Sequence, residues 1–160
     1  MKKKTIIKII SIIFVLLWMI LVFMLSNEVA IDSSSTSVNF IRLILKIFNC
    51  NVTENVLELL QPVIRKMAHF VLYTLGGILV YNMCLQLGVK KTKKKSFCIG
   101  MFYAITDEIH QLFVEGRSGE IRDVIIDSTG VVLGIIILSF IIYIVEEMKS
   151  GTKKKESSSS

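Results

Sequence analysis

The sequence contains a single proline and no stretch rich in glycine, so it lacks the segments that usually separate domains. Cys50, Cys84 and Cys98 are scattered without a C-x-x-C spacing, which argues against a disulfide framework and against a cysteine zinc motif. Charge is also sparse at 20% of residues, whereas 52% are hydrophobic and the mean hydropathy is +0.64. So apolar a chain is typical of a membrane protein, and we expect one membrane-embedded domain over residues 1–150.

Four apolar runs are long enough to cross the core of a bilayer, which takes roughly 17–25 helical residues. They cover residues 6–25, 63–87, 96–114 and 124–145. The first run has lysines before it, as a signal peptide does, but it is long and no small-residue cleavage site follows. We therefore expect it to be retained. The predicted fold is all-α, an integral membrane bundle of about four transmembrane helices.

Most of the 19 basic residues form three clusters, and positively charged loops tend to remain in the cytoplasm. One cluster flanks the start of the first span, one separates the second span from the third, and one follows the fourth. The clusters are Lys2, Lys3, Lys4 and Lys8; Lys90, Lys91, Lys93, Lys94 and Lys95; and Lys149, Lys153, Lys154 and Lys155. This distribution predicts a multi-pass plasma-membrane protein with both termini in the cytoplasm. It also explains the net charge of +6 without a nucleic-acid partner.

The segments outside the spans are polar or amphipathic. Residues 38–48 are apolar with Arg42 and Lys46 four apart, which indicates a short helix in the outer interface or a loop that dips into the headgroups. A further turn over residues 54–61 has Asn51 or Thr53 as its N-cap, and Pro62 marks the bend into the second span. The tail over residues 151–160 ends in four serines and is expected to be disordered.

Ionisable side chains accumulate in the last three spans, although each costs about 2.5–3.5 kcal/mol near the bilayer centre. In the predicted topology they all lie toward the outer leaflet, and helical periodicity places several of them on one face of each span. These polar residues are Arg65, Lys66, His69 and Tyr73, then Asp107, Glu108, His110 and Gln111, then Asp123 and Asp127. We expect the three faces to point at one another. Gly76, Gly130 and Gly134 continue two of these faces and are expected to permit close helix packing.

The ordered set of motifs carries a family resemblance. It comprises Arg65-Lys66-Met67-Ala68-His69-Phe70, Tyr73, Gly76, Asp107-Glu108-Ile109-His110-Gln111, Gly116-Arg117, Asp123, Asp127, Gly130 and Gly134. From Arg65 to Gly134 this pattern resembles the VanZ-like family of bacterial membrane proteins, with Glu115 where many relatives have proline. The resemblance implies a small helical membrane protein, of which a founding member contributes to low-level resistance to the glycopeptide teicoplanin.

Three cationic residues, Arg65, Lys66 and Arg117, favour the binding of an anionic headgroup. The guanidinium group of arginine holds phosphate or carboxylate oxygens in paired hydrogen bonds. We expect the partner to be a membrane lipid, a lipid-linked cell-wall precursor or a lipoglycopeptide. The expected ligand-binding residues are Arg65, Lys66, His69, Tyr73, Asp107, Glu108, Gln111, Arg117, Asp123 and Asp127.

Other functions of the same residues remain open. An enzyme acting on a lipid headgroup, as a hydrolase or transferase, would use His69, Asp107 or Glu108 as its general base. A purely structural cluster, in which carboxylates neutralise the cations, is the second alternative. A metal site is disfavoured, since the chain has no H-E-x-x-H motif and His110 lies about 60° from Asp107 around their helix. No cofactor is therefore expected.

Overall fold

The computed structural model describes residues 2–27, 53–115 and 119–158, together with Val38, Asn39, Arg42, Leu43 and Lys46. The four helices in these ranges are α1 (Lys2–Ser26), α3 (Glu54–Gln86), α4 (Thr92–Gln111) and α5 (Ile121–Ser158). No strand occurs in the described residues. The prediction of an all-α membrane bundle is confirmed.

Three of these helices are long and apolar enough to cross a membrane, so the chain is a multi-pass membrane protein. They are α1, α3 and α5. The fourth, α4, has 20 residues and is therefore about 30 Å long, which also matches a bilayer core. Its mean hydropathy is lower because it carries Lys93–Lys95 at its start and Asp107 and Glu108 near its end. It packs against each of the other three helices.

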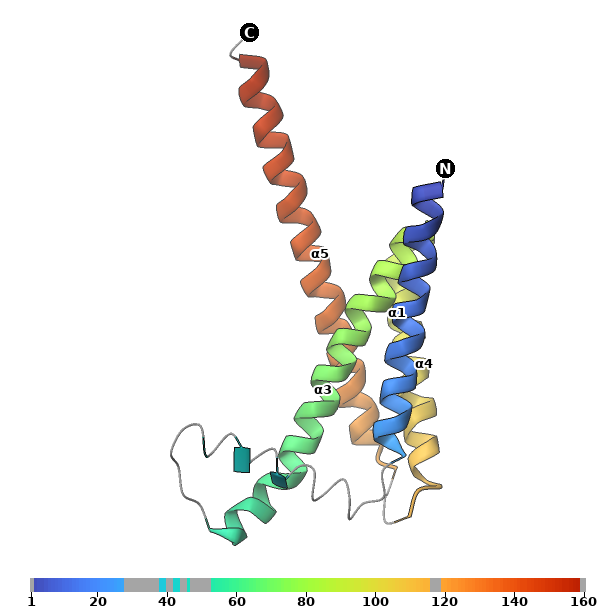
Figure 1. Cartoon of the computed structure of the whole chain (residues 1–160), viewed down its shortest axis with the longest axis vertical. Coiled ribbons are helices and arrows are strands. Elements are labelled where there is room, and N and C mark those ends of the chain that lie inside the picture. Colours follow the sequence, from blue (N-terminus) through green and yellow to red (C-terminus); the bar gives the residue numbers. More distant parts are fainter. Residues whose placement is uncertain are drawn as a thin grey trace.

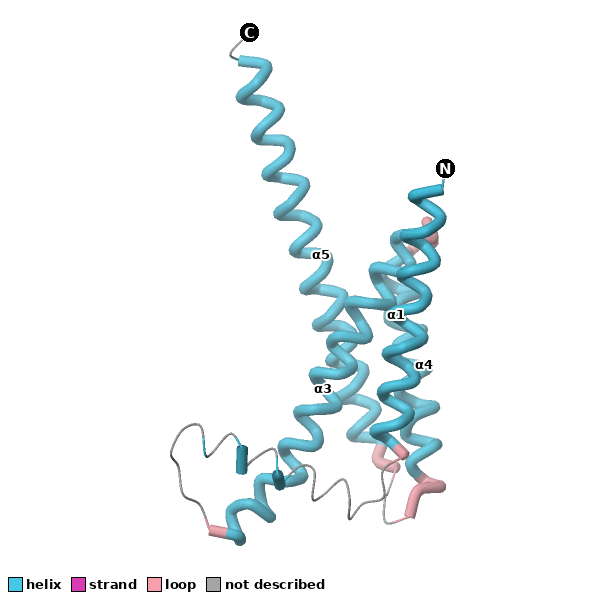
Figure 2. The backbone as a smooth tube through the Cα atoms, in the orientation of Figure 1, coloured by secondary structure: helices cyan, strands magenta, loops and turns pink. Residues whose placement is uncertain are grey.

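The two termini lie at the same end of the bundle (Figure 1). The start of α3, the end of α4 and the start of α5 lie at the opposite end, which we call the site end, and the first turns of α3 project away from the other helices there. The second half of α5 extends away from the other helices, as the tube in Figure 2 shows. Its large side chains Ile136, Phe140 and Tyr143 are more than half exposed, as expected for a surface that meets lipid tails.

Glycines allow α3 and α5 to approach until their backbones touch. A Cβ atom on Gly130 would lie 2.6 Å from the carbonyl oxygen of Phe70. A Cβ on Gly134 would collide with the carbonyl oxygen of Thr74, one turn further along α3. This contact places the first turns of α5 directly against the middle of α3, as small residues do in membrane helix pairs.

Aromatic residues join α1 to the same region of α3. The Trp18 indole nitrogen donates a 2.9 Å hydrogen bond to the carbonyl oxygen of Leu72, and the ring lies against Gly76, where a side chain would collide with it. Trp18 also packs edge-on against Tyr73, with 5.7 Å between the ring centroids. These contacts fix the direction of the Tyr73 ring, which matters for the site described below.

Two features differ from those expected from the sequence. The turn expected over residues 54–61 is continuous with the second span, so Pro62 lies inside α3, and Thr53, one of the two expected N-caps, is the N-cap of the whole helix. The residues before Pro62 are good helix formers, so the helix continues and loses a backbone hydrogen bond at the proline. In the same way α5 runs through Gly151 to Ser158, over residues where a disordered tail was predicted, because the lysines and glutamates there favour a helix.

The predicted interfacial helix over residues 38–48 falls largely outside the described residues. Those that are described there, Val38, Asn39, Arg42, Leu43 and Lys46, are helical.

Candidate functional site

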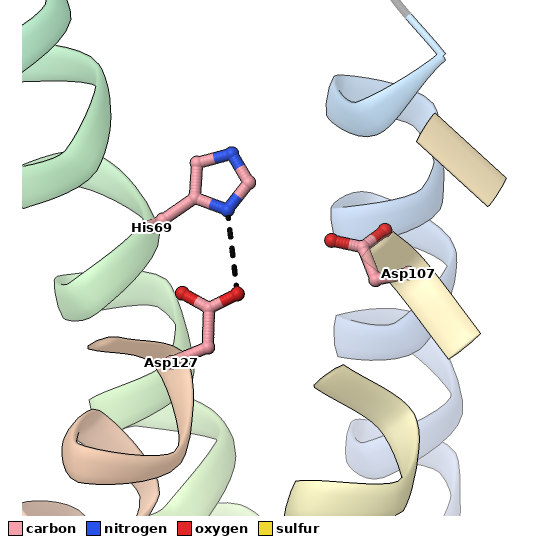
Figure 3. Close-up of side chains that lie close together, drawn as sticks. All are labelled: His69, Asp107 and Asp127. Atoms are coloured by element: carbon pink, nitrogen blue, oxygen red, sulfur yellow. Dashed lines mark ion pairs between the residues drawn. The ribbon is translucent and has the colours of Figure 1, made fainter. Parts of the chain in front are cut away.

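Three helices bring polar side chains together at the site end of the bundle. His69 comes from α3, Asp107 from α4 and Asp127 from α5, and Figure 3 shows Asp107 facing the other two from the opposite side. One ligand atom from each residue lies within 4.8 Å of the other two. We call these three residues the buried cluster. They lie on three of the polar faces that the sequence analysis expected to meet.

The two carboxylates of the buried cluster are shielded from solvent and poorly hydrogen-bonded. Asp127 is fully buried and Asp107 is 4% exposed. An ion pair joins His69 Nδ1 to Asp127 Oδ2 across 3.6 Å. Neither oxygen of Asp127 accepts a hydrogen bond within the described part of the chain, and Asp107 Oδ2 accepts only a long one, 3.4 Å, from Gln111 Nε2. A buried carboxylate in this state is costly, so its retention calls for a function.

Tyr73 adds a hydroxyl group to this environment. It follows His69 by one turn on α3 and is fully buried. Its hydroxyl has no hydrogen-bond partner among the described residues, yet it lies close enough to Asp107 and Asp127 to interact with both electrostatically. Because Trp18 holds the ring, the hydroxyl is a fixed polar group beside the buried cluster.

Lys66 belongs to a different network, one turn earlier on α3. Its Nζ lies 2.7 Å from Asp123 Oδ1 and 3.2 Å from Glu120 Oε2, and its side chain is 31% exposed. We call Lys66, Glu120 and Asp123 the surface bridge, which ties α3 to the start of α5. The sequence alone did not indicate a role for Glu120. This residue precedes α5 in a connecting segment, so it belongs to no face that helical periodicity can identify.

Glu108 supports the connection between α4 and α5. Its Oε2 accepts a 2.9 Å hydrogen bond from the backbone N–H of Glu120, and the residue is 5% exposed. It also lines a groove of about 330 Å³ between α4 and α5. The other residues lining this groove are mostly apolar: Ile105, Ile109, Leu112, Gly119, Glu120, Ile121 and Val124. The groove therefore offers an apolar surface next to the surface bridge.

Arg65 contrasts with its neighbour Lys66. It lies one turn before His69 and is partly buried, but no ion pair or hydrogen bond joins it to another residue in the described ranges. Arg117, the third cation expected at the site, lies outside the described residues. His110 stacks on Phe23 of α1, with 4.6 Å between ring centroids, and so contributes to helix packing.

The family comparison covers most of the chain. The sequence model of the VanZ/LLP1 family matches residues 11–143, a range that includes every site residue described above. No curated protein matches the chain, and no solved structure does.

Proposed function

The chain belongs to the VanZ/LLP1 family, and we propose that its site end binds the anionic headgroup of a lipid-linked or amphiphilic cell-envelope molecule. By binding such a molecule at the outer leaflet, the protein would contribute to tolerance of glycopeptides such as teicoplanin. The outer position follows from the positive-inside rule, because the lysine-rich starts of α1 and α4 and the end of α5 lie at the opposite end of the bundle.

The observation that carries the proposal is the state of Arg65. A guanidinium group that is partly buried in a membrane protein needs an anionic partner, and no described residue supplies one. Lys66 is not available to bind an anionic ligand in place of Arg65, because two carboxylates already neutralise the Lys66 ammonium. A phosphate or carboxylate of a ligand would complete the coordination of Arg65 through paired hydrogen bonds.

The groove between α4 and α5 supports an amphiphilic ligand. It is lined mainly by apolar side chains, and one of its polar lining residues, Glu120, is bonded to Lys66, the residue after Arg65. Lys66 thus links the segment that carries Arg65 to this apolar surface, which suits the hydrocarbon chain of a molecule whose headgroup binds Arg65. A lipid-linked cell-wall precursor, an anionic phospholipid and a lipoglycopeptide all have this combination of charge and apolar chain.

Native mass spectrometry of protein released gently from the membrane tests the proposal. The wild-type chain should retain one defined anionic lipid class, and Arg65→Ala should lose it. Lys149→Ala is the matched control, since it removes a cation from α5 at the opposite end of the bundle. Recovery of only bulk lipids from the wild-type chain, or equal retention by Arg65→Ala, would contradict the proposal.

A catalytic role is a second candidate, favoured by the pair of His69 and Asp127. An imidazole held by a buried carboxylate is the usual arrangement of a general base, although the 3.6 Å separation is longer than a hydrogen bond. Glu108 is less suited to that role because one of its oxygens already holds the backbone of Glu120. An enzyme would convert a labelled headgroup lipid in liposomes, and His69→Gln would abolish turnover while lipid capture persisted.

A further inference from the structure

We propose that His69, Asp107 and Asp127 bind a divalent transition-metal ion, such as Zn²⁺, between α3, α4 and α5. The proposal goes beyond the proposed function: it concerns the buried cluster, and its test, metal uptake, is separate from lipid capture at Arg65. It rests on donor chemistry, on geometry, on charge and on the groups that surround the cluster.

The donor chemistry and the geometry suit such an ion. Zn²⁺ takes imidazole nitrogen and carboxylate oxygen at about 2.0–2.2 Å, so neighbouring donors in a tetrahedral site stand about 3.4 Å apart. His69 Nδ1 and Asp127 Oδ2 are already 3.6 Å apart. One donor atom of Asp107 lies within 4.8 Å of one donor atom of each of the other two residues. An inward shift of up to about 1.5 Å by this side chain would bring all three donors to bonding distance.

The charge of the buried cluster also favours a cation. Asp107 and Asp127 are both buried and share one nearby imidazole, that of His69, while Lys66 is held by the surface bridge. Uncompensated carboxylates at such a position are unfavourable in a membrane protein. A divalent cation would balance both carboxylates, with the imidazole as a neutral ligand. An anionic headgroup could then approach Arg65 without meeting a negatively charged cluster.

The groups around the cluster are those that a three-ligand metal site requires. Sites with three protein ligands keep a fourth position for water or substrate. The buried Tyr73 hydroxyl lies near both carboxylates and could hydrogen-bond to such a group. Gln111 Nε2 contacts Asp107 Oδ2, which orients the carboxylate as an outer partner does. Because the three ligands come from three helices, a search for metal motifs within one helix does not find them.

Metal analysis of the full chain in lipid nanodiscs tests the proposal. Protein stripped with a chelator and titrated with Zn²⁺ should take up one ion per chain, measured by elemental analysis, and its Tm should rise. Asp127→Asn should lower the affinity by more than about 100-fold, and Gln111→Leu by about 10- to 100-fold, as outer partners do. Asp123→Asn is the matched control one turn earlier on α5, and it should bind Zn²⁺ as the wild-type chain does.

A second measurement keeps the test decisive if Asp127→Asn fails to fold. The chain has only two histidines, His69 and His110. Loading with Co²⁺ should shift the NMR resonances of one imidazole strongly, and His110→Gln should retain that shifted signal. Three results would each overturn the proposal: no Zn²⁺ uptake by the wild-type chain, equal affinity in a folded Asp127→Asn variant, or loss of the shifted signal in His110→Gln.

Discussion

The surface bridge and the buried cluster include residues one helical turn apart on α3. They differ in solvent exposure and in how completely their charges are neutralised. In the surface bridge an ammonium meets two carboxylates at 2.7 and 3.2 Å, with side chains that are 17–44% exposed. In the buried cluster an imidazole meets two carboxylates that are 0% and 4% exposed, across longer distances. The members of the first group satisfy one another, whereas the carboxylates of the second accept only one long hydrogen bond within the described residues.

This difference separates a structural role from a binding role. An exposed ion pair adds between zero and about 1 kcal/mol to stability, and water replaces either partner at little cost. Water cannot reach a buried carboxylate in the same way. A ligand that coordinates such a carboxylate therefore offsets a large part of the free energy that its desolvation costs. We therefore assign the surface bridge to helix positioning and the buried cluster to binding. The predictions below test this assignment.

The largest effect is expected from Asp127→Asn, which removes the charge at the centre of the buried cluster and keeps the side-chain shape. Glycopeptide tolerance should fall to the level of a strain without the protein. Asp123→Asn in the surface bridge should keep most of the tolerance, since Glu120 still pairs with Lys66. Minimal inhibitory concentrations measured in strains with matched membrane expression check the comparison. Equal losses from the two variants would contradict the assignment.

The second-largest effect is expected for the contact between α5 and α3 at Gly134, which holds both groups of charged residues against α3. Gly134→Ala would place a Cβ against the carbonyl oxygen of Thr74 and should destabilise the bundle by about 1–3 kcal/mol, because helix backbones cannot easily move apart. Gly151→Ala meets no atom within 4 Å and should be neutral or slightly stabilising. Thermal unfolding in detergent, followed by circular dichroism, distinguishes them. An unchanged Tm for Gly134→Ala would show that α3 and α5 do not touch there.

A smaller effect is expected for Trp18→Phe, which removes the hydrogen bond to Leu72 and keeps an aromatic ring against Gly76. The loss should be about 1 kcal/mol, the usual value for one such bond. Unfolding measured beside Phe14→Leu provides the comparison, since Phe14 is 54% exposed and should contribute little. If the two variants unfolded alike, Trp18 would not link α1 to the site.

The smallest effect is expected for Lys66→Met in the surface bridge. Because the lysine is partly exposed, its loss should cost less than about 1 kcal/mol, and the difference should shrink further at high salt. Unfolding at low and high ionic strength checks this. A loss of several kcal/mol, independent of salt, would place Lys66 in the binding site instead of the bridge.

The sequence alone was sufficient for the class of fold and for part of the site. Long apolar runs predicted α1, α3 and α5, and helical periodicity placed His69, Asp107 and Asp127 on faces that meet. Periodicity also placed Asp123 and Asp127 on one face of the helix, but it could not show that one is buried and the other lies at the surface. Their different environments arise from tertiary packing, because Asp127 lies between helices and Asp123 reaches Lys66 at the surface.

Other features depended on contacts that no local pattern signals. Glu120 joins the surface bridge only because the chain turns back after α4, and its backbone N–H binds Glu108 for the same reason. Pro62 was expected to mark the bend between a separate turn and the second span, and α3 instead runs through both as one helix. The role of Arg117 in ligand binding stays a prediction, as this residue lies outside the described ranges.

A pair of double-mutant cycles tests the comparison most directly. One cycle combines His69→Gln with Asp127→Asn in the buried cluster, and the other combines Lys66→Met with Asp123→Asn in the surface bridge. From unfolding free energies in the same detergent, we predict a coupling of about 2–3 kcal/mol within the cluster and below about 1 kcal/mol within the bridge. Equal couplings, or a stronger one in the bridge, would contradict the account.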